Sequence, residues 1–390
     1  MSWQYAKLSE VAPSKPLKVK NTNNDQNIWQ ITLDHIESDT GKLLKKDIQP
    51  YSKAGSSTHW FDERYVLYSK LRPYLNKVIL PDEKGIGTTE LIPMLPDKNR
   101  LDRTYLAYYL RSPKFVEWVS SQTAGAKMPR VAMGVFWEHE IPLPPLPEQQ
   151  RIAAILDKAD AIRRKRQQAL QLADEFLRSV FLEMFGDPVT NPKGWDVKPL
   201  GSLAEKIGSG STPTGGKESY ISEGVSLIRS LNIHDCQFLH KNLAFLTDKQ
   251  ANKLSNVVVE ENDVLLNITG ASVCRCAIVD NAILPARVNQ HVCIIRAKLL
   301  VPEYLLYTLV NQSYKKLLMN VAKSAGATRE AITKEQIQNL FLPVPLIELQ
   351  REFARRVQKV EGLKAKLKAS QAQAEAQFNA LSQRAFAGEL

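Results

Sequence analysis

The residues best suited to chemistry in this sequence form a glycine-rich run from Gly208 to Lys217, which has the composition of a phosphate-binding loop. Such a loop needs a lysine directly after its second glycine and a Ser or Thr after that lysine. Here Gly216 occupies the lysine position, and Glu218 stands where the magnesium-binding hydroxyl belongs. We therefore interpret the run as a flexible polar loop without nucleotide-binding chemistry.

No other segment carries a catalytic pattern. The pairs Asp187-Pro188 and Asn191-Pro192 lack the second proline and the aromatic residue of the Asp/Asn-Pro-Pro-aromatic loop of adenine methyltransferases, and no glycine fingerprint for a methyl donor accompanies them. Segments 81–84 and 96–98 do not extend to the spaced carboxylates and lysine of a metal-dependent nuclease. We predict a protein with no catalytic residues and no cofactor.

A metal site is not predicted either, because neither the histidines nor the cysteines show ligand spacing. His291 is the one histidine expected to be functional, since it lies in the basic polar run 286–291. The cysteines are expected to be buried thiols in a reducing cytoplasm. The sequence has no apolar leader and no apolar stretch of about 18 residues, which disfavours secretion and membrane insertion. The residues considered are His35, His59, His139, His234, His240, His291, Cys236, Cys274, Cys276 and Cys293.

Composition indicates a basic protein of more than one domain. The chain has 390 residues, which exceeds the usual size of one domain, and 44% of them are hydrophobic, which is enough for folded cores. Lys and Arg outnumber Asp and Glu by 52 to 41, giving a net charge of +11. This excess favours a polyanionic partner such as nucleic acid, although charge alone fits an ordinary basic protein equally well.

The elements that must position any functional residues are duplicated. A proline-rich lead-in followed by a long helical pattern begins at residue 141 and recurs at residue 341, so that Pro145, Glu148 and Arg151 reappear 200 positions later. Apolar residues recur in steps of three and four along both segments, which predicts a coiled-coil seam. The predicted seam residues are Ile152, Ile155, Ala159, Ile162, Ala169, Ala173, Phe176 and Val180 in the first segment and Phe353, Val357, Val360, Leu363, Leu367, Ala374, Phe378, Leu381 and Ala385 in the second.

The domains beside these helices are strand-rich and also repeat. Trp195 opens the second as Trp3 opens the first, and Ala-Gly-Ala precedes an arginine in each, at 124–126 and 325–327. We predict an α+β fold with a pseudo-twofold internal repeat. The predicted organisation is a strand-rich domain over 1–147, a long helix over 148–186, a second domain over 187–347 and a second long helix over 348–390.

We expect the two long helices to pack antiparallel. At about 1.5 Å per residue, roughly 35 to 40 residues extend about 50 to 60 Å, or about 15 to 17 base-pair steps of duplex DNA. The charged run 163–166 and the lysines Lys364, Lys366 and Lys368 are expected on the outer faces. The alternative is that both helices fold back into the core of one compact protein.

These features resemble the DNA-specificity subunit of type I restriction-modification systems. The resemblance rests on the segments PLPPLPEQQRI and PVPLIELQREF, which open the long helices, and on GSGSTP, DVLLNITGASVCRCAIV and ARVNQHVCIIR in the second domain. It covers essentially the whole chain and is weakest in the first domain, where YVLYSKLRPYLNKVIL only loosely parallels DVLLNITGASVCRCAIV. Cys274 departs from the family pattern, which has glycine at that position.

The resemblance implies a non-catalytic subunit. Each strand-rich domain would be a target recognition domain that grips one half of a bipartite double-stranded DNA sequence, and the helices would fix the spacing between the halves. Methylation and cleavage would belong to partners, namely two modification (methyltransferase) subunits docking on the long helices and restriction (motor-nuclease) subunits. No membrane is implied, and the protein would be cytoplasmic.

The residues expected to contact DNA are polar residues at loops and strand ends. Arg or Lys pairs with guanine and Asn or Gln with adenine, whereas phosphates need cations, hydroxyls or backbone amides. The run 287–290 and the loop ending at Arg130 are preferred, because polar residues interrupt apolar patterns there. Gln290→Ala is predicted to weaken cognate binding by about 1 to 3 kcal/mol. The candidates are Lys70, Arg72, Tyr74, Asn76, Lys77, Thr88, Thr89, Lys127, Arg130, Ser211, Thr212, Lys217, Arg229, Asn232, Asn267, Thr269, Arg275, Arg287, Asn289, Gln290 and His291.

Three other functions compete with this one. The missing motifs disfavour a stand-alone enzyme, and the two basic domains disfavour a pure coiled-coil scaffold. A stand-alone sequence-specific DNA-binding regulator stays open at this point, and co-purification of partner subunits would distinguish it.

Overall fold

The structure is a computed structural model in which the described residues are 3–19, 23–213, 215–324 and 330–390. The second Ala-Gly-Ala segment, at 325–327, and the arginine that follows it, Arg329, lie outside the described residues. The same holds for Thr214 in the glycine-rich run and for the side chain of Lys217.

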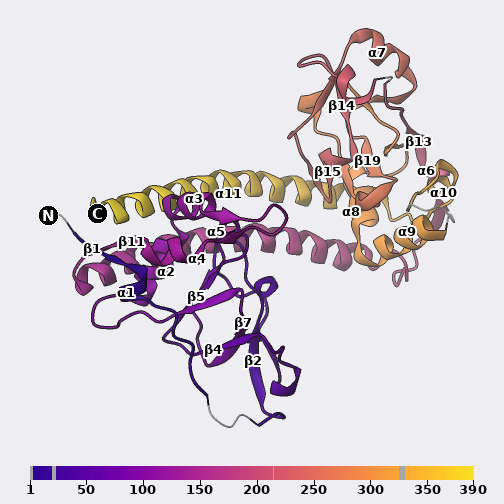
Figure 1. Cartoon of the computed structure of the whole chain (residues 1–390). Coiled ribbons are helices and arrows are strands. Elements are labelled where there is room, and N and C mark those ends of the chain that lie inside the picture. Colours follow the sequence, from indigo (N-terminus) through magenta and orange to yellow (C-terminus); the bar gives the residue numbers. More distant parts are fainter. Residues whose placement is uncertain (1–2, 20–22, 214, 325–329) are drawn as a thin grey trace. The chain divides into compact units, whose positions relative to one another are not determined.

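Two compact units share the two long helices. The first unit contains residues 1–168 and 368–390, and the second contains residues 169–367. The boundary between the units falls inside both long helices, α5 (Leu146–Phe185) and α11 (Ile347–Ala387), as Figure 1 shows along the chain. Each unit therefore consists of a strand-rich part and a portion of each long helix.

The first unit contains a four-stranded and a three-stranded sheet. The strand order is β3-β2-β7-β4 in one and β6-β5-β8 in the other. β2 and β7 are parallel, and the other pairs in these two sheets are antiparallel. The bounds are β1 (Gln4–Lys7), β2 (Asn27–Ile31), β3 (Asp47–Pro50), β4 (Thr58–Phe61), β5 (Val66–Ser69), β6 (Val78–Ile79), β7 (Gly85–Thr88), β8 (Leu91–Met94), β9 (Thr123–Ala124), β10 (Arg130–Val131) and β11 (Glu140–Leu143).

The second unit repeats this strand order. The sheet β17-β14-β21-β18 matches β3-β2-β7-β4, again with one parallel pair, β14 and β21, in the middle. The run β22-β19-β20 matches β8-β5-β6, with β13 added beside β22, and β12 pairs with β23 as β1 pairs with β11. The bounds are β12 (Val197–Pro199), β13 (Ala204–Ser209), β14 (Val225–Ile228), β15 (Ile233–His234), β16 (Gln237–Phe238), β17 (Ala244–Leu246), β18 (Val258–Val259), β19 (Val264–Asn267), β20 (Cys276–Ile278), β21 (Ala286–Val288), β22 (Val292–Ala297) and β23 (Phe341–Pro343).

A pair of consecutive helices follows the sheets in each unit. In the first unit, α2 begins after Asp102, whose carboxylate accepts the N–H groups of Thr104 and Tyr105 at 2.9 Å each. Pro113 opens α3, a position where the missing N–H costs nothing. The helices are α1 (Leu8–Val11), α2 (Arg103–Arg111), α3 (Pro113–Ser121), α4 (Met133–Glu138), α6 (Leu200–Leu203), α7 (Asp248–Lys253), α8 (Pro302–Val310), α9 (Gln312–Ser324) and α10 (Lys334–Gln338), with 3-10 turns η1 (Leu33–His35), η2 (Tyr51–Lys53), η3 (Pro73–Leu75), η4 (Gly216–Ser219), η5 (Ser230–Asn232), η6 (Ser255–Val257), η7 (Gly270–Ser272) and η8 (Asn281–Ile283).

A buried glutamine ties the start of each long helix to its own unit. Gln149 has no exposed surface, and its amide accepts the N–H of Asp102 (2.8 Å) and donates to the carbonyl of Pro144 (2.7 Å). Gln350 donates in the same way to the carbonyl of Pro345 (2.8 Å). Buried amides with all these bonds made are costly to lose, so they fix where each helix begins.

This pair corrects the offset of the repeat, which is 201 residues, from Gln149 to Gln350, and not the 200 that the matching letters suggest. The buried tyrosine hydroxyls agree, because Tyr105 donates to the carbonyl of Pro142 in β11 and Tyr304 to that of Pro343 in β23. The matching letters follow solvent-exposed residues, whereas burial of the amide and the tyrosines sets the structural register.

Within each unit the two long helices pack antiparallel, as predicted. In the first unit Arg163 of α5 donates to Glu375 of α11 (2.9 Å). In the second, Phe353 near the start of α11 packs on Phe181 near the end of α5, with 5.6 Å between ring centroids.

The predicted seam is wrong in part. Ile152 and Val180 are buried as expected, but Ile162, Phe176 and Leu363 are 50%, 54% and 54% exposed. A straight helix has 3.6 residues per turn, so its contact stripe drifts away from a strict seven-residue repeat.

Two charged residues predicted on the outer faces are buried at the helix contact instead. Arg163 and Lys364 are 7% and 6% exposed. Arg163 pairs with Asp160 (2.5 Å) and Glu375, and Lys364 pairs with Asp174 (2.6 Å). Carboxylates on the two helices thus allow cations to occupy positions that the pattern assigned to apolar residues.

Candidate nucleic-acid interface

Segments 69–77 and 267–275 have the same backbone geometry in the two units. In each, the N–H of the first residue donates to the carbonyl of the last, at 3.0 and 2.8 Å. In each, the residue before the last has a left-handed φ, +48° at Asn76 and +66° at Cys274. The left-handed φ accounts for the glycine that the family pattern has at Cys274. The two segments are structurally equivalent although their sequences match only loosely.

The segments Thr88-Thr89-Glu90 and Asn289-Gln290-His291 are equivalent as well. In each unit the second residue of the preceding loop donates its N–H to the carbonyl of the third residue here, at 3.0 Å. Thr89 therefore occupies the place of Gln290, and Glu90 that of His291.

A third segment completes each arrangement, because a backbone bridge joins Leu71 to Arg130 in the first unit and Thr269 to Ala331 in the second. We call the resulting surfaces the first edge (residues 69–77, 88–90 and 127–130) and the second edge (residues 211–213, 267–275 and 289–291). The predicted residues brought together are Lys70, Arg72, Tyr74, Thr88, Thr89, Lys127 and Arg130 on the first edge and Ser211, Thr212, Thr269, Arg275, Asn289, Gln290 and His291 on the second.

On the first edge a carboxylate orients the main arginine. Glu90 accepts from Nε and Nη2 of Arg130 (3.1 and 2.9 Å), and this contact raises the pKa of Arg130. Arg72, Tyr74 and Lys127 are exposed beside it. Sequence reasoning missed Glu90, although its place at the end of a polar Thr-Thr-Glu interruption between apolar strands was the available signal.

A polar cavity of about 360 Å³ adjoins Thr88 at the end of β7. Its lining includes Lys53, Ser57 and Thr58 from the turn before β4 and the start of that strand, and Thr32 after β2. Sequence reasoning missed Lys53, because the Lys-Ala-Gly motif indicates only a turn. The cavity adds hydroxyls and one ammonium group close to the first edge.

On the second edge four side chains form a continuous chain of hydrogen bonds. The hydroxyl of Thr212 donates to Oε1 of Gln290, and Nε2 of Gln290 donates to Nε2 of His291 (3.2 Å). Nδ1 of His291 in turn contacts the hydroxyl of Thr269. The glycine-rich run, the turn after β19 and the start of β22 each contribute to this chain.

Gly210 allows the glycine-rich run to reach the second edge. A Cβ atom at this position would lie 1.7 Å from the carbonyl oxygen of Val288, which is an impossible contact. The N–H of Gly210 also donates to the carbonyl of Asn289 (3.2 Å). The glycine-rich run thus holds Thr212 against β21, and this structural role replaces the phosphate chemistry that its composition suggested.

The three predicted arginines of the second unit differ in how they are held. Arg287 donates from Nε and Nη1 to the carbonyls of Ala251 and Ala286 (3.1 and 2.9 Å), and burial lowers the pKa of Arg287. Arg229 donates to the carbonyl of Asn242 and lies over an aromatic ring, away from the chain of hydrogen bonds around Gln290. In the part of the chain that the structure describes, the half-buried guanidinium of Arg275 has no recorded partner.

Four predicted readers are supporting residues in this structure. Asn232 and Asn267 have no exposed surface, and Asn76 is 8% exposed. Each donates its side-chain amide to a backbone carbonyl of its own unit, as Asn267 does to Ser230 (2.9 Å), and Lys77 does the same with its ammonium group. A short amide inside a loop stabilises that loop instead of facing a ligand, which the sequence pattern could not reveal.

Other chemistry finds little support in the described ranges. Burial raises the pKa of Cys236, Cys274 and Cys293 to about 12, so these thiols stay protonated at neutral pH. Over residues 3–19, 23–213, 215–324 and 330–390, no cluster of His, Cys, Asp or Glu is arranged to hold a metal ion. Among the same residues, no helix is both long and apolar enough to cross a bilayer.

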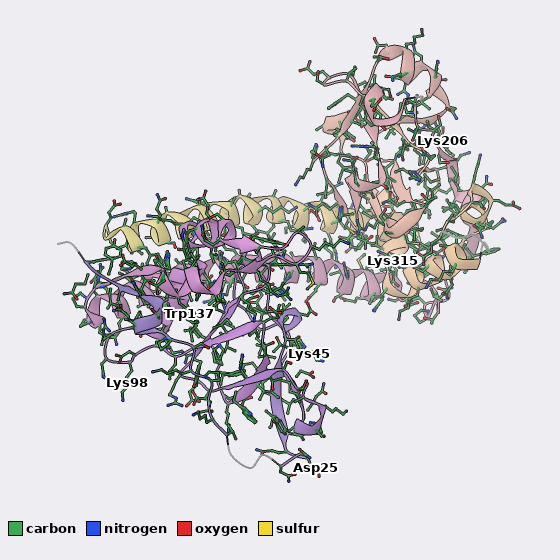
Figure 2. All side chains as sticks on the ribbon, in the orientation of Figure 1. Asp25, Lys45, Lys98, Trp137, Lys206 and Lys315 are labelled. Carbon is green, nitrogen blue, oxygen red and sulfur yellow. The ribbon has the colours of Figure 1, made fainter. Side chains whose placement is uncertain are left out.

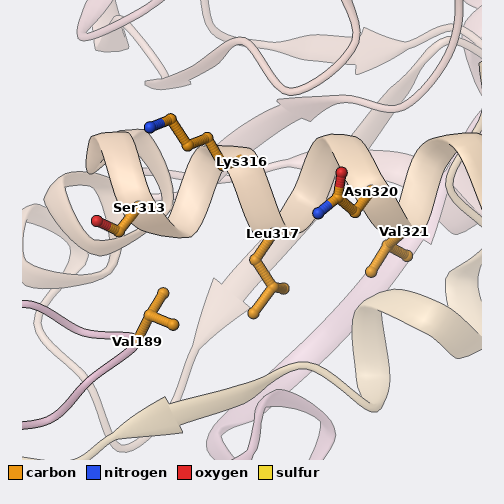
Figure 3. A pocket seen from close by; sticks show the side chains of 6 residues that line it. All are labelled: Val189, Ser313, Lys316, Leu317, Asn320 and Val321. Carbon is orange, nitrogen blue, oxygen red and sulfur yellow. The ribbon is translucent and has the colours of Figure 1, made fainter.

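Two further features of the second unit lie outside the second edge. A cavity of about 500 Å³ runs along α9, where Val189 faces Ser313 and Leu317 (Figure 3). Lys315 of α9, labelled in Figure 2, pairs with Asp235. Neither feature includes a predicted DNA-contacting residue.

The sequence matches the family described as type I restriction modification DNA specificity domain over residues 2–172 and 192–376. It is 24% identical over 296 residues to the type I restriction enzyme MjaVIII specificity subunit of Methanocaldococcus jannaschii, covering 72% of this chain and 68% of that protein. It is 25% identical over 229 residues to the EcoDI specificity subunit of Escherichia coli, covering 56% of this chain and 51% of that protein. The matched parts are thus half to two thirds of these relatives.

Solved structures share the fold. A chain from a structure that describes complex assembly and conformational transition of the type I R-M system superposes with a TM-score of 0.57 at 22% identity, covering all of this chain and 98% of that one. The type I restriction-modification S subunit from M. genitalium superposes with a TM-score of 0.58 at 14% identity, covering 99% and 96%. At these identities the likeness shows the two-domain, two-helix architecture alone.

Proposed function

Because this chain belongs to the family of type I restriction-modification DNA specificity subunits, we propose that it recognises a bipartite double-stranded DNA sequence and directs methylation and restriction by partner subunits. In this proposal the target recognition domains are residues 1–147 and 187–347. The long helices at 148–186 and 348–390 are spacers between them.

The observation that carries the proposal is the equivalence of the two edges. Both units hold the same three segments with the same backbone hydrogen bonds, but Thr89 stands in one where Gln290 stands in the other, and Glu90 where His291 stands. A shared frame with different polar side chains is what two readers of two different half-sequences require.

The charges support DNA as the ligand. The net charge of +11 favours association with a polyanion, and exposed groups such as Lys127 and Ser211 suit phosphates. The oriented guanidinium of Arg130 and the oriented amide of Gln290 are planar groups of the kind that distinguish bases. We assign base reading to these two groups and backbone positioning to the former.

We propose that the length of the long helices sets the number of unread base pairs. The 40 residues of α5 extend about 60 Å, which corresponds to roughly 17 base-pair steps. Exposed cations on these helices, Arg164, Lys165, Lys366 and Lys368, would remain available to partners.

Catalysis is assigned to the partners, namely two modification (methyltransferase) subunits on the long helices and motor-nuclease restriction subunits. The complex would act on DNA in the cytoplasm. This division of labour fits a family of specificity subunits.

Mapping methylated bases in the host genome with and without this gene tests the proposal. We expect deletion to abolish methylation at one motif made of two short sequences separated by a fixed gap, and the tagged chain to co-purify with a methyltransferase. Unchanged methylation together with a partner-free chain that binds one site tightly would favour a stand-alone DNA-binding regulator.

A further inference from the structure

The amide of Gln290 is held by neighbours on both sides while the residue remains exposed. Its Oε1 accepts from the hydroxyl of Thr212, and its Nε2 donates to Nε2 of His291 (3.2 Å). Since an amide nitrogen cannot accept, Nε2 of His291 is the acceptor and the ring proton is on Nδ1, from which it is donated to Thr269. The amide oxygen and nitrogen of Gln290 therefore cannot exchange places without losing both bonds.

The unused valences of this amide define what it can bind. A primary amide has two donor hydrogens and an oxygen with two lone pairs. Thr212 occupies one lone pair and His291 takes one hydrogen, so one donor and one acceptor remain. In the major groove only adenine presents an acceptor and a donor side by side, at N7 and N6. Guanine presents two acceptors, cytosine a donor, and thymine an acceptor with a methyl group.

We propose that Gln290 reads an adenine in the half-site of the second unit, donating from Nε2 to N7 and accepting at Oε1 from N6. This inference rests on the proposed function, because it takes the second edge as a DNA-reading surface. Thr212 and His291 are positioning residues that hold the amide in one orientation. The first unit has Thr89 at the equivalent place, so the contact belongs to one half-site only.

Selection of bound sequences from a random duplex pool by the full-length chain tests the assignment. The wild-type chain is expected to select a split consensus with a required adenine in one half. Gln290→Ala is expected to lose the preference at that adenine and to keep the other half unchanged. Gln290→Glu has no N–H for N7 and is expected to prefer cytosine there, because a carboxylate accepts from N4.

A matched control separates this effect from general changes to the surface. Gln237 is an exposed glutamine in β16 of the same unit, outside the second edge. Gln237→Ala is expected to select the wild-type consensus in both halves.

A base analogue then tests the N7 contact directly. A duplex with 7-deazaadenine at the identified position is expected to bind the wild-type chain about 5- to 150-fold more weakly than the normal duplex. Gln290→Ala should bind both duplexes equally. Thr212→Val, which removes the positioning hydroxyl at nearly constant volume, should reduce the same discrimination without affecting the other half.

The outcomes distinguish this inference from the proposed function. An unchanged consensus for Gln290→Ala, or equal binding of the 7-deaza duplex by the wild-type chain, overturns the adenine assignment while the split consensus remains. A guanine requirement at the affected position also overturns it in favour of a minor-groove contact. If the wild-type chain selects no split consensus, the proposed function itself fails.

Discussion

Single residues on the first edge separate two kinds of DNA contact. Arg130 is held by Glu90, so its guanidinium has a fixed direction. The ammonium group of Lys127 is exposed, with no recorded partner among the residues that the structure describes. A mobile point charge suits phosphates, and a fixed planar group suits a base.

We therefore predict that Lys127→Ala weakens binding to all duplexes to the same extent. The slope of log K against log salt should fall by about 0.9, because one fewer counterion is released. Titrations at several salt concentrations measure the slope. Lys98→Ala, an exposed lysine away from the first edge (Figure 2), should leave it unchanged. A loss confined to the cognate sequence would show that Lys127 reads a base.

His139 makes the stability of the first unit depend on pH. Its ring lies 3.8 Å from that of Trp118, centroid to centroid, and its Nε2 is 2.8 Å from the hydroxyl of Tyr109. Burial lowers the pKa of His139 from 6.5 to about 4. The unfolded chain therefore takes up a proton below pH 6.5 that the folded ring does not, so stability is complete above that pH and falls towards pH 4.

We predict that lowering the pH from 7.5 to 5 reduces the free energy of unfolding by about 1 to 2 kcal/mol more for the wild-type chain than for His139→Leu, allowing for solvent screening of the partly exposed ring. Leucine is the residue at the equivalent place in the second unit, Leu340. Urea denaturation at both pH values measures the difference. Equal losses in the two proteins would mean that His139 is protonated in the fold.

At the scale of elements, the start of each long helix depends on one buried amide. We predict that Gln149→Ala lowers the free energy of unfolding by about 3 kcal/mol, because it leaves several buried backbone groups without partners. Gln150→Ala, at the neighbouring exposed position, should change it by less than about 0.5 kcal/mol. Urea denaturation compares the two variants. A larger loss for Gln150→Ala would restore the 200-residue offset that the matching letters suggest.

The order of elements was predictable because it follows from local patterns. The helix pairs, the strand runs and the two long helices all lie where periodicity and turn residues put them. The phase of the helix contact was not predictable. Asp160 and Arg163 are buried there, whereas Ile162 is half-exposed, because ion pairs between the helices depend on residues distant in sequence.

The candidate site was predictable to a similar degree. Thr212, Gln290 and His291 come from separate motifs, and the structure brings them together. Asn232 and Asn267 have the same residue type as a base reader, but their burial depends on loops that curl around them. Composition of a loop indicates polarity, and only the fold determines which polar groups face outward.

At the scale of the whole molecule, the unit boundary lies between residues 168 and 169 in α5 and between 367 and 368 in α11. Inserting seven residues at both points lengthens each helix by about 10 Å while keeping the contact stripe nearly in phase. Under the proposed function, we predict that the gap in the selected consensus grows by about three base pairs. Both half-sequences should remain unchanged.

Insertion into α5 alone is the control, because it moves one helix past the other and mismatches the contacts of Arg163 and Lys364. That variant should lose stability in thermal unfolding. If the double insertion left the gap unchanged, the helices would not determine the spacing.

The second unit is one uninterrupted stretch of chain, whereas the first is completed by residues that follow it, including Phe378 and Ala385 in its core. On the ribosome, the part that starts later can therefore finish folding earlier. Until α11 emerges, the rings of Tyr105 and Tyr108 lack their neighbours Phe386 and Phe378. At common elongation rates this lasts about 10 to 45 seconds, during which a nascent chain would offer an oily surface to chaperones.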